Sequence, residues 1–298
     1  MAVKNPSTFV ISITCFDEQN RFDAQAQRKH FRRLVAAGIG AYVGGGGSGE
    51  GFVMTEEDYK QLLQVAKEEL KGKVPFRFMG HEPRSAEAYI KLCKLAKNYD
   101  FDAMQIYSLD MGHGGHPDER ILEGYFRDIL DEIKEPAVLS SHMAAGYFIP
   151  IPLIKRLVHD YKHIIGLNLT NPDPMYTQTL REDIGDRVEM HCGPTYQAMN
   201  FLSMGCTGHL SSEGNLIPKT AMSIYHWYKK GDLDKTLEAF NLEMKVMQHC
   251  MPGKAALKIL GQPGMTVRRP RLEPMPEKLK SIEEWLKKLD IKNIEGIN

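Results

Sequence analysis

Eight short apolar runs alternate along this chain with longer stretches of helical character, and this alternation most limits how the chain can fold. Each run has the length of a buried strand, and the residues between runs have the spacing of an amphipathic helix. Repeated strand–helix units place their strands parallel in one sheet, and eight units are the number that closes a (β/α)8 barrel. The runs occupy residues 9–14, 41–43, 75–79, 103–107, 137–139, 164–169, 187–191 and 208–211.

A doubly wound open sheet is the alternative arrangement of the same elements. Such a sheet typically has a glycine-rich turn after its first strand, whereas this chain has Thr14-Cys15-Phe16-Asp17 there. The residues beyond Ile217 show helical patterns without strands between them. We therefore predict an α/β fold, a (β/α)8 or TIM barrel at residues 1–218, with a C-terminal helical extension at residues 219–298 that packs on the barrel.

Charge and cysteine usage exclude several classes of protein. Basic and acidic residues number 38 each, so the net charge favours neither a nucleic acid nor an anionic membrane as partner. The sequence has no apolar run of membrane-spanning length, and its first residues lack the apolar core of a signal peptide. The five cysteines form no C-x-x-C pair, which does not suit a disulfide framework. We expect a cytoplasmic protein with a small-molecule ligand.

Several motifs, in order along nearly the whole chain, resemble those of the dihydrodipicolinate synthase and N-acetylneuraminate lyase family. The first strand ends in Thr14-Cys15-Phe16-Asp17, which is similar to the family's T-P-F/M-D. The segment Gly46-Gly47-Ser48-Gly49-Glu50, followed by Thr55-Glu56-Glu57, is similar to G-T-T-G-E and a T-x-E-E helix start. Further matching segments are Pro117 to Phe126, Gly205 to Asn215, Pro252 to Gly261 and Arg269-Pro270. The resemblance implies a barrel whose active site lies at the C-terminal ends of its strands.

The strand at residues 164–169 departs from that family at its most important position. The family reads I-I-G-I-K-E, and its lysine forms an imine with pyruvate or a related 2-oxo acid. Asn168 stands at the lysine position here. An amide nitrogen cannot form an imine, because its lone pair is delocalised into the carbonyl group. The chemistry at this position must therefore differ from that of the family.

The fifth strand departs as well. The family reads Y-N-x-P-x-x-T-G, with a tyrosine that passes protons, whereas this chain reads Ser140-Ser141-His142-Met143-Ala144-Ala145-Gly146. By position Ser140 replaces the tyrosine, although a one-residue gap that aligned Gly146 with the family glycine would shift this register. A serine hydroxyl is a poor proton donor near neutral pH compared with a phenol. Both members of the family's lysine–tyrosine pair are thus replaced.

The loop after the second strand, Gly44 to Gly51, is rich in glycine. Its backbone amides could approach an anion closely, and the helix start beside it would add positive potential. A tight strand-to-helix turn is the alternative interpretation. The resemblance implies that the hydroxyls of G-T-T-G-E hold a substrate carboxylate; Ser48 keeps the second hydroxyl, and Gly47 lacks the first. We predict substrate contacts at Gly47 and Ser48, and expect Glu50 to cap or brace the following helix.

Histidines fall at several predicted strand ends, and imidazole suits general acid–base work near neutral pH. We predict His142, Asn168 and Ser140 as catalytic residues. The predicted substrate-binding residues are Gly47, Ser48, Ser141, His113 and Glu213.

Alternatives accompany these assignments. His209 is expected to face the helices, and the loop from His113 to His116 is equally well interpreted as a flexible connection. No H-x-H or H-E-x-x-H spacing supports a metal, so no cofactor is predicted; a divalent metal, if bound, would use His142, His191 and Glu213. Buried Cys15 and Cys192 are a more usual interpretation than nucleophiles.

Two functions of different class remain open. The first is a lyase-type enzyme, like an aldolase or a hydro-lyase, that acts on a small carboxylate or oxo-acid substrate without a Schiff base. Asn168 would then hydrogen-bond a carbonyl or carboxylate, and His142 would move protons. The second is a non-catalytic member that only binds a small molecule; a metal-dependent aldolase or hydrolase is a weaker third possibility. Polar strand ends favour the enzyme, because a decayed site would fill with apolar residues.

The resemblance also implies a homo-oligomer, either a dimer or a tetramer. In the family a tyrosine from the loop after the fourth strand often enters a neighbouring site. Residues 110–116 form that loop here and contain no tyrosine. The shared-site arrangement is therefore not expected.

Overall fold

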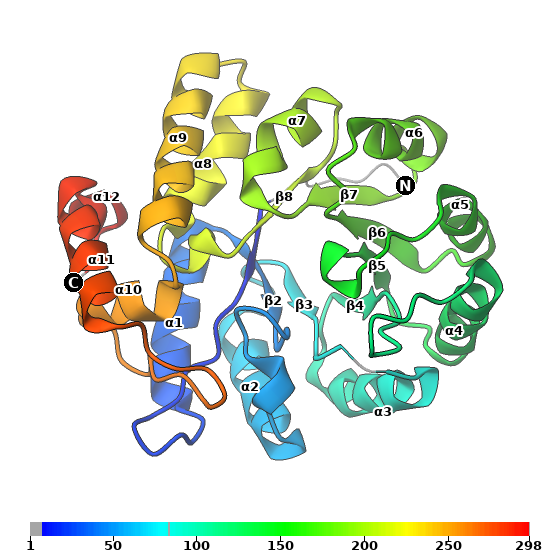
Figure 1. Ribbon diagram of the computed structural model, residues 1–298, viewed down its shortest axis with the longest axis horizontal. Helices are drawn as coiled ribbons and strands as arrows, with labels where there is room; N and C mark the ends of the chain where they lie inside the picture. Colours follow the sequence, from blue (N-terminus) through cyan, green and yellow to red (C-terminus); the bar gives the residue numbers. More distant parts are fainter. Residues whose placement is uncertain (1–7, 83, 298) are drawn as a thin grey trace. The chain divides into compact units, whose positions relative to one another are not determined.

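A closed barrel of eight strands in chain order is the centre of the fold (Figure 1). The computed structural model describes residues 8–82 and 84–297. The strands are β1 (Phe9–Ile11), β2 (Gly40–Val43), β3 (Phe76–Phe78), β4 (Ala103–Tyr107), β5 (Ala137–Ser141), β6 (Ile164–Leu169), β7 (Glu189–Cys192) and β8 (Gly208–Ser211). The predicted (β/α)8 barrel with C-terminal helices is confirmed.

Helices alternate with these strands and then continue alone to the C-terminus. They are α1 (Ala24–Ala37), α2 (Glu56–Glu69), α3 (Ala86–Ala96), α4 (Glu119–Glu132), α5 (Ile151–Asp160), α6 (Pro174–Ile184), α7 (Ala198–Ser203), α8 (Pro218–Lys229), α9 (Leu233–His249), α10 (Gly253–Ile259), α11 (Pro276–Lys288) and α12 (Ile291–Glu295). Within the described residues, no helix combines the length and apolarity needed to cross a membrane.

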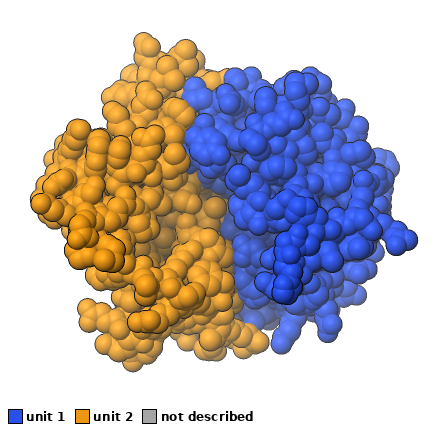
Figure 2. Space-filling model, in the orientation of Figure 1, with its two compact units in different colours: residues 1–7, 77–210 blue, residues 8–76, 211–298 orange. Residues whose placement is uncertain are grey.

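The chain divides into two compact units (Figure 2). Unit 1 contains residues 77–210 of the described chain, and unit 2 contains residues 8–76 together with those from 211 onward. The predicted domain boundary between residues 218 and 219 stays a prediction.

In unit 1 the strand register aligns four side chains in one row. Tyr107 of β4 pairs with Ser140 of β5, Ser140 with Asn168 of β6, and Asn168 with His191 of β7. Register partners on parallel strands project from the same face of a sheet, and side chains alternate between faces along a strand. The four residues therefore share one face, with Gln105 two positions before Tyr107 on that same face.

In unit 2 the C-terminal helices share a core with the first strand segment. Ile13 and Cys15 belong to one buried cluster with residues of α9 to α12, among them Val246 and Ile282. The last helical stretch of the chain forms two helices, α11 and α12. The separation occurs at Asp290, whose φ of 52° lies in the left-handed region and cannot continue a helix.

Asp23 defines the N-terminal end of α1. The helix begins at Ala24 because the side chain of Asp23 accepts a hydrogen bond from the backbone N–H of Ala26. Such a cap satisfies a donor that the helix itself leaves open.

Candidate active site

The row Tyr107, Ser140, Asn168 and His191 is the polar feature of unit 1 at the carboxyl ends of its strands. All four side chains are buried. Asn168 occupies the place in β6 at which the sequence predicted altered chemistry, and Ser140 lies beside it in register. The row brings together the predicted residues Ser140, Asn168 and His191, and adds Tyr107, for which the sequence left a place in the cavity lining undecided.

Asn168 has a specific partner that the sequence did not reveal. Its Nδ2 donates a hydrogen bond to Oε1 of Gln105 over 2.5 Å. The two residues are 3% and 2% exposed. Oδ1 of Asn168 is buried and receives no hydrogen bond from the described residues. The sequence signal for this partner was one polar residue, Gln105, at the centre of an otherwise apolar run.

A buried ion pair lies on the same face, one step earlier along the strands. Nη2 of Arg77 in β3 lies 2.5 Å from Oε2 of Glu189 in β7. Gly166 of β6 pairs with Glu189 in register, and a Cβ on this glycine would lie 3.5 Å from the Cβ of Glu189. Each charge of the pair thus has a counter-charge within unit 1, which a buried charge requires.

Ser141 faces the other side of β5 from Ser140, as strand alternation requires. Its hydroxyl accepts a hydrogen bond from the backbone N–H of Ile149 at 3.0 Å and lies 3.2 Å from the hydroxyl of Tyr176. These contacts hold the segment that leads into α5. Substrate contact by Ser141 stays a prediction, and its hydroxyl already has two protein partners.

His142 follows β5 and is exposed. Its Nδ1 accepts a hydrogen bond from the backbone N–H of Ala144 at 3.0 Å. A neutral ring in this arrangement carries its proton on Nε2. Partial desolvation holds the pKa of His142 below its ordinary value, so the neutral form dominates at pH 7. The geometry presents Nε2–H outward as a donor, whereas action as a base requires Nδ1 to leave Ala144.

His113 lies on an exposed turn after β4, between Gly112 and Gly114. Its φ is 51°, and both glycines also have positive φ. The nearby His116 ring packs 5.8 Å from that of Tyr147. A role for His113 in substrate binding stays a prediction.

The glycine-rich loop of unit 2 is both a tight turn and an open surface. Thr14 donates through Oγ1 to the carbonyl of Gly49 at 2.6 Å. A Cβ on Gly49 would lie 2.7 Å from the carbonyl oxygen of Gly45, and one on Gly51 would lie 2.4 Å from that of Gly44. These positions require glycine. At Gly47, by contrast, no heavy atom lies within 4 Å of an added Cβ.

Ser48 makes a contact that the sequence did not predict. Its Oγ lies 3.1 Å from Oγ of Ser212, which directly follows β8. Glu213, the next residue, is buried, and its Oε2 lies 3.4 Å from the Ser211 hydroxyl. Unit 2 therefore brings together Ser48 and the end of β8. Two consecutive serines at that strand end were the available signal for Ser212.

The helix start that was expected to add positive potential at the loop lies further along the chain. The loop leads into a three-residue 3-10 helix, Gly51–Val53, and α2 begins only at Glu56. Thr55 caps α2 and forms a capping box with Asp58, and the first turn carries three acidic residues. The cap satisfies part of the backbone donors at this helix start, and the acidic residues counter its positive potential, so a contribution of α2 to the loop stays a prediction.

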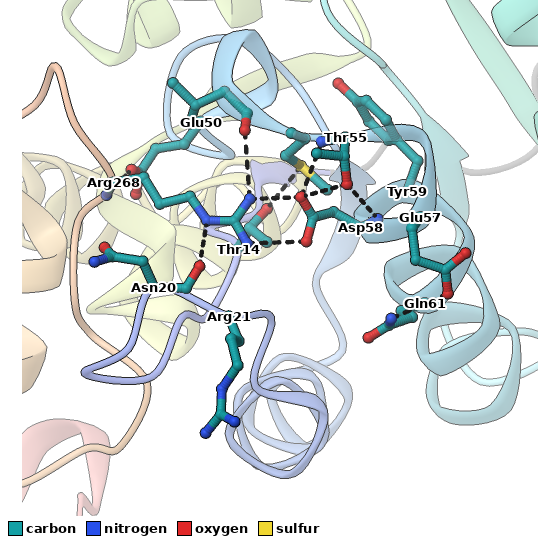
Figure 3. A network of polar contacts seen from close by, with 12 residues as sticks. Thr14, Asn20, Arg21, Glu50, Thr55, Glu57, Asp58, Tyr59, Gln61 and Arg268 are labelled. Carbon is teal, nitrogen blue, oxygen red and sulfur yellow. Dashed lines mark hydrogen bonds and ion pairs between the residues drawn. The ribbon is translucent and has the colours of Figure 1, made fainter.

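Of the two roles expected for Glu50, the cap is wrong, because its side chain makes no capping hydrogen bond, and the bracing role stays a prediction (Figure 3). Its buried carboxylate forms an ion pair with Lys254 and accepts a hydrogen bond from the backbone N–H of Arg268 at 2.9 Å. Burial lowers the pKa of Lys254, and the attraction of Glu50 opposes this shift. Arg271 donates through Nη2 to the carbonyl of Gly47 at 2.7 Å. Residues 268–271, called the C-terminal segment below, thus contact the glycine-rich loop at two points, Glu50 and Gly47.

Metal and cysteine chemistry receive no support from the described residues. No group of three or more histidine, cysteine or acidic side chains that could hold a metal occurs in residues 8–82 and 84–297. The metal set of His142, His191 and Glu213 stays a prediction, because Glu213 belongs to the other unit. Cys15 and Cys192 are buried, as predicted, and burial raises the pKa of Cys15 to about 12. Such a thiol does not ionise near neutral pH.

Known proteins with similar sequences cover nearly the whole chain. A 4-hydroxy-tetrahydrodipicolinate synthase of Methanopyrus kandleri is 23% identical, over 92% of this chain and 93% of its own. A probable 5-dehydro-4-deoxyglucarate dehydratase of Paracidovorax citrulli is 24% identical, over 93% of each chain.

Solved structures with the same fold include a putative dihydrodipicolinate synthase family protein from Coccidioides immitis, with a TM-score of 0.88, 18% identity and coverage of 100% of this chain and 99% of that chain. Dihydrodipicolinate synthase from Aquifex aeolicus has a TM-score of 0.86, 19% identity and coverage of 97% and 99%. The model of the Dihydrodipicolinate synthetase family matches residues 5–289, and the chain therefore belongs to this family.

Proposed function

We propose that this protein is a lyase-type enzyme that acts on a small carboxylate substrate of the oxo-acid class without forming a Schiff base. The observation that carries the proposal is Asn168, a buried amide in the polar row at the strand ends of unit 1. Two relatives are named a synthase and a dehydratase, which supports carbon–carbon or carbon–oxygen lyase chemistry. Neither unit needs a bound metal for the roles proposed below.

The residues have separate roles in this proposal. In unit 2, contact of Ser48 and Gly47 with a carboxylate stays a prediction of its own. The roles that follow belong to unit 1. Asn168 and Ser140 orient the oxygen-bearing carbon, since both lie side by side in the row. His142 moves a proton through its ring, which is exposed and neutral near pH 7.

One observation favours a binding protein as the second candidate. Nδ1 of His142 accepts a backbone hydrogen bond and is not available as a base in this arrangement. A binder would be stabilised by small carboxylates and show no turnover.

Reductive trapping tests the absence of an imine. Incubation with pyruvate and borohydride should leave the intact mass unchanged, because an amide cannot condense with a ketone. An adduct on any lysine would overturn the proposal. A thermal shift with pyruvate that weakens in Ser48→Ala would support carboxylate binding at the loop, and an unchanged shift would overturn it.

Cytoplasmic location and assembly as a homotetramer complete the proposal. Light scattering on the purified protein tests the assembly, with a mass of four chains as the expected result. A single-chain mass would overturn it.

A further inference from the structure

We infer that Gln105 fixes the amide of Asn168 so that Asn168 accepts a hydrogen bond from the ligand, and that the ligand group at this position is a hydroxyl. The inference rests on the proposed function for the presence of a small carboxylate ligand. It reverses the role expected from the sequence, in which Asn168 donates to a carbonyl or carboxylate.

The contact between the two amides sets this direction. The 2.5 Å separation joins Nδ2 of Asn168 to Oε1 of Gln105. A carbonyl oxygen has no hydrogen to donate, so the nitrogen of Asn168 must supply the proton of this bond. This bond uses one of the two N–H donors of Asn168, and its carbonyl oxygen Oδ1 is the acceptor that no described residue reaches. Gln105 is a positioning residue, since it acts on the ligand only through Asn168.

The acceptor Oδ1 of Asn168 is energetically unfavourable without a hydrogen-bond donor. Oδ1 of Asn168 is buried, and no hydrogen bond reaches it from residues 8–82 or 84–297. Nearly all buried polar atoms in native proteins have a partner, and those that lack one often mark a place for a missing molecule. The position of Asn168 in the row at the strand ends, beside Ser140, places this acceptor where the proposed substrate binds.

The chemistry of an acceptor selects the ligand group. A ketone or carboxylate oxygen carries only lone pairs, so it would repel Oδ1 of Asn168. A hydroxyl can donate to it. An ammonium group could also donate, but the acidic side chain on this face, Glu189, is already neutralised by Arg77 at 2.5 Å. A neutral donor therefore fits this environment better than a ligand cation in addition to Arg77. The substrate class is therefore a carboxylic acid that carries a hydroxyl.

Matched ligands that differ only in this group test the inference. Pyruvate, L-lactate and D-lactate have the same carboxylate and size, and isothermal titration measures the affinity of each. One lactate enantiomer should bind the wild-type protein at least about tenfold more tightly than pyruvate, because a site that pairs with a hydroxyl rejects the analogue without it. Equal or tighter binding of pyruvate would overturn the inference and leave the proposed function intact. If no acid binds, the proposed function fails, and this inference fails with it.

Three variants test the role of Gln105. Gln105→Met keeps the length but removes the acceptor, so the Asn168 amide can turn and the ratio of lactate to pyruvate affinity should fall at least about fivefold. Gln105→Glu keeps an acceptor and should preserve the ratio. Asn168→Asp offers only acceptor oxygens and should also preserve the ratio of lactate to pyruvate affinity. It provides a second test if the buried charge of Gln105→Glu prevents folding. An unchanged ratio in Gln105→Met, or its loss in a folded Gln105→Glu, would show that Asn168 is not oriented in this way.

Discussion

Arg268 in the C-terminal segment makes a two-point contact with Asp58 near the start of α2, with Nη2 to Oδ1 at 2.9 Å and Nη1 to Oδ2 at 2.5 Å. Asp58 also completes the cap of α2, because its Oδ2 accepts from the backbone N–H of Thr55 at 2.9 Å. The guanidinium stacks 3.9 Å from the Phe16 ring centroid. Its Nε donates to the carbonyl of Asn20 (Figure 3). One side chain thus joins four segments of unit 2.

Arg268→Met should lower the free energy of unfolding by about 3 kcal/mol. It removes a largely buried partner and leaves the Asp58 carboxylate without its main counter-charge. Urea unfolding at pH 7 measures the change. The control is Arg21→Met, whose side chain is 74% exposed in its pair with Asp17, and which should cost less than about 1 kcal/mol. Equal losses in the two variants would contradict the prediction.

The Asp58 pair should contribute stability that depends on pH. Burial alone would raise the pKa of Asp58, but hydrogen bonds from Arg268 and Thr55 outweigh burial and hold the pKa below its ordinary value. A carboxyl group whose pKa is lowered by folding stabilises the protein above its unfolded pKa of about 3.9. This stabilisation is lost as the pH falls through the lower folded value.

The measurement compares wild type with Asp58→Asn by urea unfolding between pH 7 and pH 3. The stability difference between them should be largest at pH 7 and shrink below about pH 4. A difference that grows on acidification would mean that the sign of the shift is wrong.

The glycine-rich loop should tolerate a side chain at one position and reject it at another. Gly47→Thr meets open space and should change stability by less than about 0.5 kcal/mol. Gly51→Ala places a methyl 2.4 Å from the Gly44 carbonyl oxygen and 2.7 Å from the hydroxyl of Tyr59. It should cost about 2 kcal/mol, because backbone must move. Melting curves of the two variants check the contrast, and a destabilised Gly47→Thr would disprove the open position.

His142→Ala should remove proton transfer while leaving the fold intact. The side chain is exposed, so the free energy of unfolding should change by less than about 0.5 kcal/mol. The chemical readout is the exchange of pyruvate methyl protons for deuterium, followed by NMR. His159→Ala is the control, because that histidine has a side chain 84% exposed and should affect neither property. Exchange that persists in His142→Ala would exclude the residue from proton transfer.

The alternation of strands and helices was enough to predict the barrel, because each unit of this fold is local in sequence. The break at Asp290 was not predictable, since aspartate occurs inside helices as well as at left-handed turns. The replaced lysine position at Asn168 was visible from the family motif. Its partner Gln105 was not, because the two residues are 63 positions apart and only the strand register places them together.

The same limit explains the error about Glu50. A glutamate before a helix suggests a cap, but the actual partners, Lys254 and Arg268, lie about two hundred residues further along the chain. Neither carries a local signal that points back to Glu50. Pairings of this kind follow from tertiary packing and need the structure.

Because the C-terminal segment contacts the glycine-rich loop, the order of synthesis determines when this loop can fold. The described part of unit 1, residues 77–210, is complete once position 210 leaves the ribosome. Residues 44–51 emerge early, yet Lys254 and Arg268, which fix Glu50, are made about two hundred residues later. Because domains fold as their residues become available, the glycine-rich loop takes its final form only after residue 268 has been made.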